Sequence, residues 1–233
     1  GHGLLFYGKR GCGKEAFSQY FLAWVLCLNR HVKNVPCGEC NSCLWLKSDT
    51  HPNYVYISTD EENKKQNAKI KIEKIRDLLP FVQQTVDGWR VIVIEPAEAL
   101  NIASANALLK TLEEPGDRTM IILLAEHYLK LPATIRSRLQ HYALDRISDA
   151  QADEYLNQNL SDLDPIQKQL LLNLSNHMPL QALKLANAEW LQKRQEFLMD
   201  WQKLVIQKNM PMAIATKWSK NLSFSDFAQM FEY

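Results

Sequence analysis

The chain has almost no net charge and no long apolar segment. Its 233 residues carry a formal net charge of +1, so no overall field attracts nucleic acid, and any contact with DNA requires a local patch. No run of about 18 or more apolar residues occurs, so no membrane span is expected. The hydrophobic content of 46% is ordinary for a globular protein. We therefore expect a cytoplasmic protein without a membrane partner.

Internal repeats are also absent, and strand-like segments are confined to the first part of the chain. Short apolar runs, typical of strands covered on both faces, occur at residues 4–7, 53–58, 91–94 and 119–125. Apolar residues recur at helical spacing in residues 14–28, 72–82 and 101–112. Pro80 is a possible kink in the second of these helices. No strand is expected after Arg138, and helices follow from about residue 148. This order predicts an α/β domain with a helical appendage.

The stretch GKRGCGKEAF, residues 8–17, has the form of a phosphate-binding loop. Gly8, Gly13 and Lys14 fit the pattern, and Gly11 adds a further glycine. Such glycines let backbone N–H groups face a phosphate at a helix N-terminus. Glu15, however, stands where a Ser or Thr hydroxyl would bind Mg²⁺. We expect a vestigial loop in which ATP and Mg²⁺ are not bound productively; the alternative is an intact nucleotide site.

An acidic residue ends the predicted strand at residues 91–94. Glu95 follows the strand directly, and Glu98 comes three residues later. A magnesium-binding acidic pair normally occupies this place in phosphate-loop folds. Here the pair is altered, because Glu95 replaces the usual Asp and Pro96 stands where a catalytic acid is expected. We interpret Glu95 either as a degenerate metal-binding position or as part of a solvated acidic loop.

Four of the five cysteines are crowded into a short segment. Cys37, Cys40 and Cys43 form a C-x-x-C-x-x-C pattern, and Cys27 lies ten residues before the first of them. Four thiolates can surround Zn²⁺ as a tetrahedron, with no open position for catalysis. We therefore predict a structural zinc site, with an iron–sulfur cluster or free thiols as alternatives. The fifth cysteine, Cys12, lies in the phosphate loop and is interpreted as a space-filling residue.

A basic stretch at residues 64–76 could contact DNA phosphates. Acidic residues interleave with the lysines in and around it, so we interpret it as a solvated face.

These motifs together resemble a known family. The four-cysteine spacing, THPNY (50–54), NALLKTLEEP (106–115) and IRSR (135–138) are similar to the delta-prime subunits of the bacterial DNA polymerase III clamp loader, which belong to the AAA+ class. The resemblance covers nearly the whole chain. It implies an AAA+ α/β domain over 1–146 with a zinc module at 27–43, a helical lid domain over 147–188, and the start of a helical collar domain over 189–233. By the same comparison, we expect both ends of the protein to be truncated.

The resemblance also assigns a role to Arg138. The family carries a Ser-Arg-Cys motif, which matches Ser137, Arg138 and Leu139 here, so the Cys is replaced. In the family this arginine reaches the ATP of a neighbouring subunit, where a guanidinium stabilises the charge of the transferring phosphoryl group. Arg138 is thus the candidate arginine finger. The alternative is an ordinary salt bridge.

Three parts of the ATP machinery of the family's motor subunits are altered. Glu15 replaces the hydroxyl residue, Ala125 and Glu126 occupy the place of a polar sensor, and no arginine occurs between Ile147 and Lys193 to serve as the lid sensor. The resemblance therefore implies a subunit that does not hydrolyse ATP but works beside tau/gamma and delta subunits, and indirectly with the sliding clamp and primer-template DNA. The alternatives are an ATP-hydrolysing tau/gamma-type motor and a purely structural, zinc-stabilised scaffold.

Overall fold

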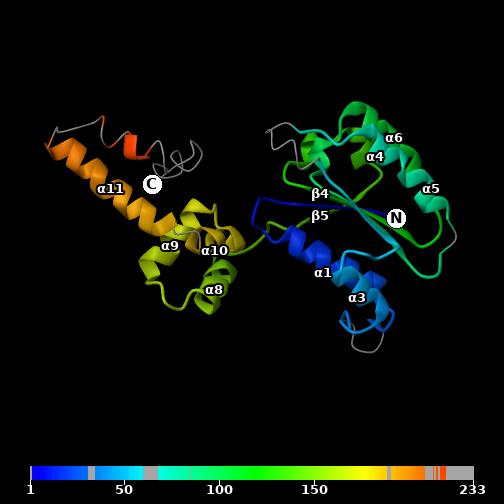
Figure 1. Cartoon of the computed structure of the whole chain (residues 1–233), viewed down its shortest axis with the longest axis horizontal. Helices are drawn as coiled ribbons and strands as arrows, with labels where there is room; N and C mark the ends of the chain where they lie inside the picture. Colours follow the sequence, from blue (N-terminus) through cyan, green and yellow to red (C-terminus); the bar gives the residue numbers. More distant parts are fainter. Residues whose placement is uncertain are drawn as a thin grey trace. The chain divides into compact units, whose positions relative to one another are not determined.

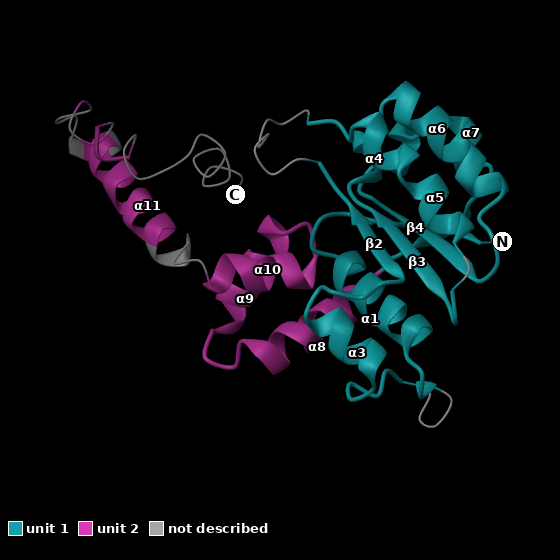
Figure 2. Cartoon of the chain, turned by 45° about the vertical axis from the view of Figure 1, so that its right-hand side comes forward, with its two compact units in different colours: residues 1–146 teal, residues 147–233 magenta. Residues whose placement is uncertain are grey.

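The computed structural model describes residues 2–30, 35–59, 68–84, 86–187 and 190–207, together with 212, 214 and 216–218. The chain forms two compact units, Gly1–Arg146 and Ile147–Tyr233 (Figure 2). Part of the basic stretch predicted at 64–76 lies outside the described residues. The assignment of unit 2 to a lid and a collar stays a prediction.

Unit 1 contains one parallel sheet of five strands in the order β2-β3-β4-β1-β5. Figure 1 labels the strands β4 and β5 of this sheet. The strands are β1 (Gly3–Tyr7), β2 (Tyr54–Ile57), β3 (Arg90–Ile94), β4 (Thr119–Ala125) and β5 (Gln140–Ala143). The first four confirm the strands predicted from apolar runs. The expectation that no strand follows Arg138 was wrong, because β5 pairs with β1 at the edge of the sheet. Most residues of β5 are exposed, and the strand begins with the polar residues Gln140 and His141. The sequence of β5 therefore contains no apolar run that would predict a strand.

Helices cover both faces of this sheet. They are α1 (Lys14–Leu26), α3 (Asn41–Lys47), α4 (Ile72–Arg76), α5 (Leu78–Gln83), α6 (Ile102–Glu113) and α7 (Ala133–Arg136), with short 3₁₀ turns η1 (Ala97–Ala99) and η2 (Tyr128–Lys130). The helix predicted at 72–82 is divided at Asp77 and not at Pro80. Pro80 lies in the first turn of α5, where its missing N–H costs no helical hydrogen bond.

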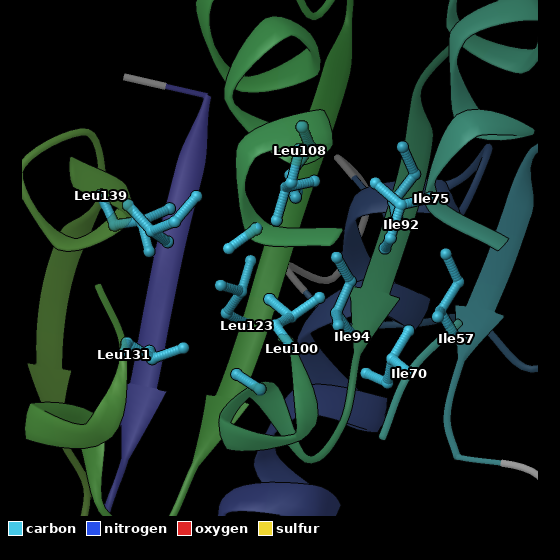
Figure 3. Packing of buried hydrophobic residues seen from close by; sticks show 14 of the residues in the cluster. Ile57, Ile70, Ile75, Ile92, Ile94, Leu100, Leu108, Leu123, Leu131 and Leu139 are labelled. Carbon is cyan, nitrogen blue, oxygen red and sulfur yellow. The ribbon is translucent and has the colours of Figure 1, made fainter. Parts of the chain in front are cut away.

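Alternating side chains of the strands fill two apolar clusters, one on each face of the sheet. One face carries Leu5, Ile92 and Leu123, which pack with buried residues of α4, α5 and α6. Figure 3 shows Ile92 and Leu123 of this cluster with Ile75 of α4 and Leu108 of α6. The other carries Leu4 and Val93, which pack with buried residues of α1. This alternation follows from the two-residue period of a strand. Because all strands are parallel, the residues that follow β1, β3 and β4 meet at one edge of the sheet.

A buried arginine ties the start of β3 to α5. Arg90 is 1% exposed, and its Nη1 donates to the carbonyl oxygen of Val82 at 2.8 Å and its Nη2 to that of Gln84 at 2.6 Å. Its guanidinium also lies 5.0 Å from the centre of the Phe81 ring. The carbonyl groups at the end of a helix lack intrahelical partners, so Arg90 satisfies those at the end of α5.

Unit 2 is helical, as predicted. Its helices are α8 (Asp149–Asn159), α9 (Pro165–Leu174), α10 (Pro179–Asn187) and α11 (Trp190–Gln207). Ser148 and Asp164 cap α8 and α9 through reciprocal capping boxes. The core of the unit includes Leu156, Leu171 and Phe197. In the described part of the chain, no helix is long and apolar enough to cross a membrane.

Candidate metal centre and nucleotide-type site

The phosphate-type loop connects β1 to α1 at the carboxyl edge of the sheet. Gly11 and Gly13 have positive φ angles of 81° and 93°, which glycine adopts at little cost. A Cβ atom added to Gly8 would lie 2.9 Å from the Cys12 Sγ and 3.0 Å from the backbone N of Asp145. The glycines thus keep the loop in a close-packed form. This packing also gives Cys12 the space-filling environment predicted for it, and burial raises the pKa of its thiol.

Lys14, the cation of the loop, is paired with its sequence neighbour. The Lys14 Nζ lies 3.1 Å from the Glu15 Oε1, with side-chain exposures of 6% and 48%. The residue that replaces the magnesium-binding hydroxyl therefore places its carboxylate on the ammonium group that would bind phosphate. A nucleotide would compete with Glu15 for Lys14.

The acidic residues after β3 are engaged by protein groups. The Tyr56 hydroxyl donates a hydrogen bond to the Glu95 Oε2 at 3.0 Å. Burial raises the pKa of Glu95 and, together with the charge of Glu95, raises the pKa of Tyr56 to about 12. Glu95 lines a cavity of about 470 Å³ with Gln19, Asp49, Tyr54 and Tyr56. The Glu98 Oε1 accepts a hydrogen bond from the backbone N–H of His127 and so links η1 to the end of β4.

The four cysteines Cys27, Cys37, Cys40 and Cys43 come together, as their spacing predicts. Cys27 directly follows α1, Cys43 lies in α3, and the other two lie in the turn between these helices. The four Sγ atoms all lie within 4.8 Å of one another, and those of Cys37 and Cys43 are 4.0 Å apart. Four sulfur atoms at about 2.3 Å from one zinc ion lie about 3.8 Å apart. The cluster therefore has the size and the donor set of a site that could bind a metal ion.

Backbone amides favour the thiolate form of Cys37 and lower its pKa. The N–H of Cys40 donates to the Cys37 Sγ at 3.3 Å, and the N–H of Cys37 donates to the Cys27 Sγ at 3.4 Å. Hydrogen bonds from the amides of Glu39 and Cys40 lower the pKa of Cys37 to about 6, because they stabilise the charged sulfur. Burial raises the pKa of Cys43 to about 12. A metal ion that binds thiolates replaces the thiol protons. Cys37, in the turn between α1 and α3, loses its proton readily because its pKa is lowered.

Arg138 lies just after α7 and is held by α6. Its Nε and Nη2 donate to the Glu113 Oε1 at 2.9 and 2.6 Å, and its Nη1 donates to the carbonyl oxygen of Thr134 at 2.8 Å. The side chain is 37% exposed, so the guanidinium is oriented and still reaches the surface. Arg136, two residues earlier, instead lies over the Tyr128 ring at 6.0 Å.

Sequence reasoning named the four cysteines, the phosphate-type loop and Arg138, and missed residues that contact the loop and Arg138. Glu113 was not predicted as the partner of Arg138, although it lies within the NALLKTLEEP stretch. Asp145, whose Oδ2 accepts a hydrogen bond from the Lys9 N–H at 3.3 Å, was also missed. Its position just after β5 could have indicated a role beside the loop, had β5 been predicted.

This arrangement is that of an AAA+ protein: a five-stranded parallel sheet with a phosphate-type loop at its carboxyl edge, followed by a helical unit. The fold is similar to the solved structure of a DNA polymerase III gamma subunit-related protein from Thermotoga maritima, with a TM-score of 0.51 and 19% sequence identity over 98% of this chain and 72% of that one. A family model described as "DNA polymerase III, delta subunit" matches residues 1–148. The chain therefore belongs to the delta-prime family of DNA polymerase III subunits.

The similar relatives include both delta-prime and tau/gamma subunits. The chain is 35% identical to the delta-prime subunit of Pseudomonas aeruginosa, over 94% of this chain and 66% of the relative. It is 33% identical to that of Haemophilus influenzae, over 84% of this chain and 58% of the relative. The tau/gamma subunit of Haemophilus influenzae is 32% identical over 66% of this chain and 22% of its own length. The chain thus spans less than two thirds of the length of these relatives.

Proposed function

We propose that this chain is a clamp-loader subunit that does not hydrolyse ATP and that donates Arg138 to the ATP site of a neighbouring tau/gamma motor subunit. Its partners are then tau/gamma and delta subunits in a cytoplasmic hetero-oligomer that loads the sliding clamp onto primer-template DNA. The family membership supports the assembly. One observation supports both parts of this proposal: Lys14 is paired with Glu15, while the same chain holds Arg138 in a fixed orientation. The first feature opposes ATP hydrolysis by this chain, and the second favours a role for Arg138 at a neighbouring subunit's ATP.

The chain's own nucleotide-type site supports the first half of the proposal. Lys14 is already neutralised by a carboxylate, and that carboxylate would repel a triphosphate. Glu95 is hydrogen-bonded to Tyr56 and not held in an open acidic pair. Ala125 ends β4 without a polar side chain that could act as a sensor. Together these features oppose magnesium binding and phosphoryl transfer in this chain.

The environment of Arg138 supports the second half. A finger must reach a partner's phosphate and must also be oriented, because misplacement of a catalytic group removes most of its effect. The contacts with Glu113 and Thr134 orient the guanidinium while more than a third of the side chain stays exposed. By this proposal, Arg138 stabilises negative charge on the γ-phosphate of the neighbouring subunit's ATP.

We also propose that the four-cysteine centre binds one structural Zn²⁺. The four sulfur donors and their spacing fit zinc, and all four positions of a tetrahedron are filled by protein. Such an ion would fix the turn that carries Cys37 and Cys40 against α1 and α3. It would supply stability to the module, with no open coordination position for chemistry.

The test is the ATPase activity of a reconstituted loader made from the full-length protein with its tau/gamma and delta partners. An arginine finger contributes about 10³–10⁵ in rate at its own site. Arg138→Ala should therefore abolish turnover at one site and lower the total by that site's share. Lys130→Ala, which changes an exposed cation on the preceding turn, is the matched control and should leave the activity unchanged. Equal activity of the Arg138→Ala and wild-type loaders would refute the finger and favour the scaffold.

The intact loop geometry and the tau/gamma relatives favour a second candidate, an ATP-hydrolysing motor subunit. It predicts steady ATP hydrolysis by the purified full-length chain that Lys14→Ala abolishes. The proposed function predicts no such activity in the wild-type chain.

A further inference from the structure

A chain of hydrogen bonds connects the start of β2 to the cysteine module. His51 is 8% exposed and Ser42 is 3% exposed. The His51 Nδ1 accepts a hydrogen bond from the Asn53 N–H at 3.0 Å, and its Nε2 lies 2.8 Å from the Ser42 Oγ. The Ser42 Oγ donates its proton to the carbonyl oxygen of Leu26 at 2.7 Å.

The donors and acceptors of this chain fix the tautomer of His51. A neutral imidazole has one donor and one acceptor nitrogen. Because Nδ1 accepts from a backbone N–H, the proton must be on Nε2, and the Ser42 hydroxyl accepts it while donating to Leu26. Burial lowers the pKa of His51 and so favours the neutral form. Both imidazole nitrogens of His51 and the hydroxyl group of Ser42 therefore have hydrogen-bond partners.

This series of hydrogen bonds ends at residues next to two of the four cysteines, Cys27 and Cys43. Ser42 directly precedes Cys43, and Leu26 directly precedes Cys27. These are the two buried cysteines, with exposures of 4% for Cys27 and 8% for Cys43. The hydrogen bond between Ser42 and Leu26 thus joins the C-terminal end of α1 to α3 at the positions where each presents its ligand.

Packing holds His51 in this position. The Trp45 ring, one turn along α3 from Ser42, meets the imidazole edge-on with 5.9 Å between ring centres. His51 also precedes β2 by three residues, and β2 pairs with β3 in the sheet. The imidazole is therefore fixed to the body of unit 1, while the other two ligands, Cys37 and Cys40, lie in a turn outside this network.

We propose that His51 is a positioning residue of the metal centre. Through Ser42 it holds Cys27 and Cys43 in ligand geometry, independently of the turn that carries Cys37 and Cys40. Half of the ligand set is then ordered by the α/β domain itself, so metal binding has less conformational entropy to overcome. This inference rests on the proposed zinc site. Outer groups that orient metal ligands typically change metal affinity by about 10- to 100-fold.

The main test compares zinc release from the full chain carrying His51→Phe with release from the wild type. Phenylalanine keeps an aromatic ring beside Trp45 but neither accepts from Asn53 nor donates to Ser42. Zinc-loaded protein is mixed with the chromogenic chelator 4-(2-pyridylazo)resorcinol, and the release rate is recorded. We expect about 10-fold or faster release from His51→Phe. Equal rates would overturn the proposal, whereas a wild-type chain that takes up no zinc would refute the metal assignment itself.

Further variants separate positioning from a general loss of stability. Ser42→Ala interrupts the same series of hydrogen bonds at Ser42. The effects of His51→Phe and Ser42→Ala on the zinc release rate should be non-additive, because both interrupt one network. His51→Gln can still donate an amide N–H toward Ser42 and should recover part of the loss. Ser48→Ala, which removes a hydroxyl bonded to Leu44, Trp45 and Thr50 at the C-terminal end of α3, is the matched control.

A spectroscopic readout completes the test. With Co²⁺ in place of Zn²⁺, absorption bands report the tetrahedral thiolate geometry directly. His51→Phe should shift or broaden these bands, while Ser48→Ala should reproduce the wild-type spectrum. Should His51→Phe fail to fold, Ser42→Ala alone decides: an unaltered cobalt spectrum together with an unaltered zinc release rate would overturn the proposal.

Discussion

Replacing Glu15 with threonine should strengthen nucleotide binding by the phosphate-type loop. The change removes a carboxylate that lies 3.1 Å from the Lys14 Nζ and supplies the hydroxyl that the phosphate-loop pattern requires. At this distance the attraction is about 5 kcal/mol for an effective dielectric constant of 20. Glu15 is about half exposed, however, and pairs at protein surfaces contribute about 0–1 kcal/mol. We therefore expect the release of Lys14 to contribute about 1 kcal/mol.

That energy corresponds to about fivefold in affinity, and removal of the repulsion between Glu15 and the triphosphate adds to it. We expect Glu15→Thr to bind ATP about tenfold more tightly than the wild type, with a further gain from Mg²⁺. Titration of a fluorescent ATP analogue into the purified chain, with and without Mg²⁺, measures both effects. Under the proposed function, we expect no ATP hydrolysis by the Glu15→Thr variant, because Ala125 and the arginine-free segment after Ile147 are unchanged.

Glu15→Gln separates the two parts of this argument. It neutralises the carboxylate without supplying a hydroxyl, so it should strengthen ATP binding without the magnesium-dependent gain. The reasoning is refuted if both variants are folded and bind ATP no better than the wild type. In that case the pairing of Lys14 and Glu15 does not limit the affinity of the loop for ATP.

Three further predictions concern groups that the structure shows in contact. Glu113→Ala should lower the ATPase of the assembled loader, because Arg138 loses its orienting acceptor, while Glu113→Gln, which keeps an acceptor oxygen, should lower it less; steady-state turnover measures both. Cys40→Ser should reduce zinc content well below about one ion per chain, measured by atomic emission. Arg90→Met should lower the free energy of unfolding by about 1–3 kcal/mol in a urea titration, because it leaves the buried carbonyl group of Val82 without its donor.

Each of these predictions has a control. A loader with Glu113→Ala that is as active as the wild type would show that Arg138 needs no orientation by α6. Cys12→Ser should retain full zinc content, since Cys12 belongs to the phosphate-type loop. Lys110→Met, which changes an exposed cation on α6, should alter the free energy of unfolding by less than about 0.5 kcal/mol; an equal loss in both methionine variants would contradict the capping role of Arg90.

The parts of the fold predicted from sequence are those with a strong local signal. Strands β3 and β4 are covered on both faces, so nearly every residue is apolar and the run is visible. The edge strand β5 carries polar residues and was missed. The division of the helix at Asp77 was also missed, because proline is the residue expected to interrupt a helix and Pro80 was the nearest one. Pro80 in fact lies in the first turn of α5, where proline is tolerated.

The candidate site was predicted to the same extent. The clustering of the four cysteines follows from their spacing, since short intervals constrain where the sulfur atoms can lie. Partners far apart in sequence left no such signal: Arg138 and Glu113 are 25 residues apart, and Ser42 and Leu26 are 16 apart. These pairs depend on how α6 meets α7 and how α1 meets α3. No periodicity in the sequence encodes that packing, so it had to be read from the structure.

Helix α1 connects the phosphate-type loop to the cysteine cluster. Its first residue, Lys14, belongs to the phosphate-type loop, and Cys27 follows its last residue. Thirteen residues at about 1.5 Å each make a rigid strut about 20 Å long. If the cysteine cluster holds the proposed zinc ion, its removal with a chelator should increase the rate of amide deuteration around Gly13, at the opposite end of α1. The backbone of the phosphate-type loop would thereby report whether the cysteine cluster at the other end of α1 holds its metal ion.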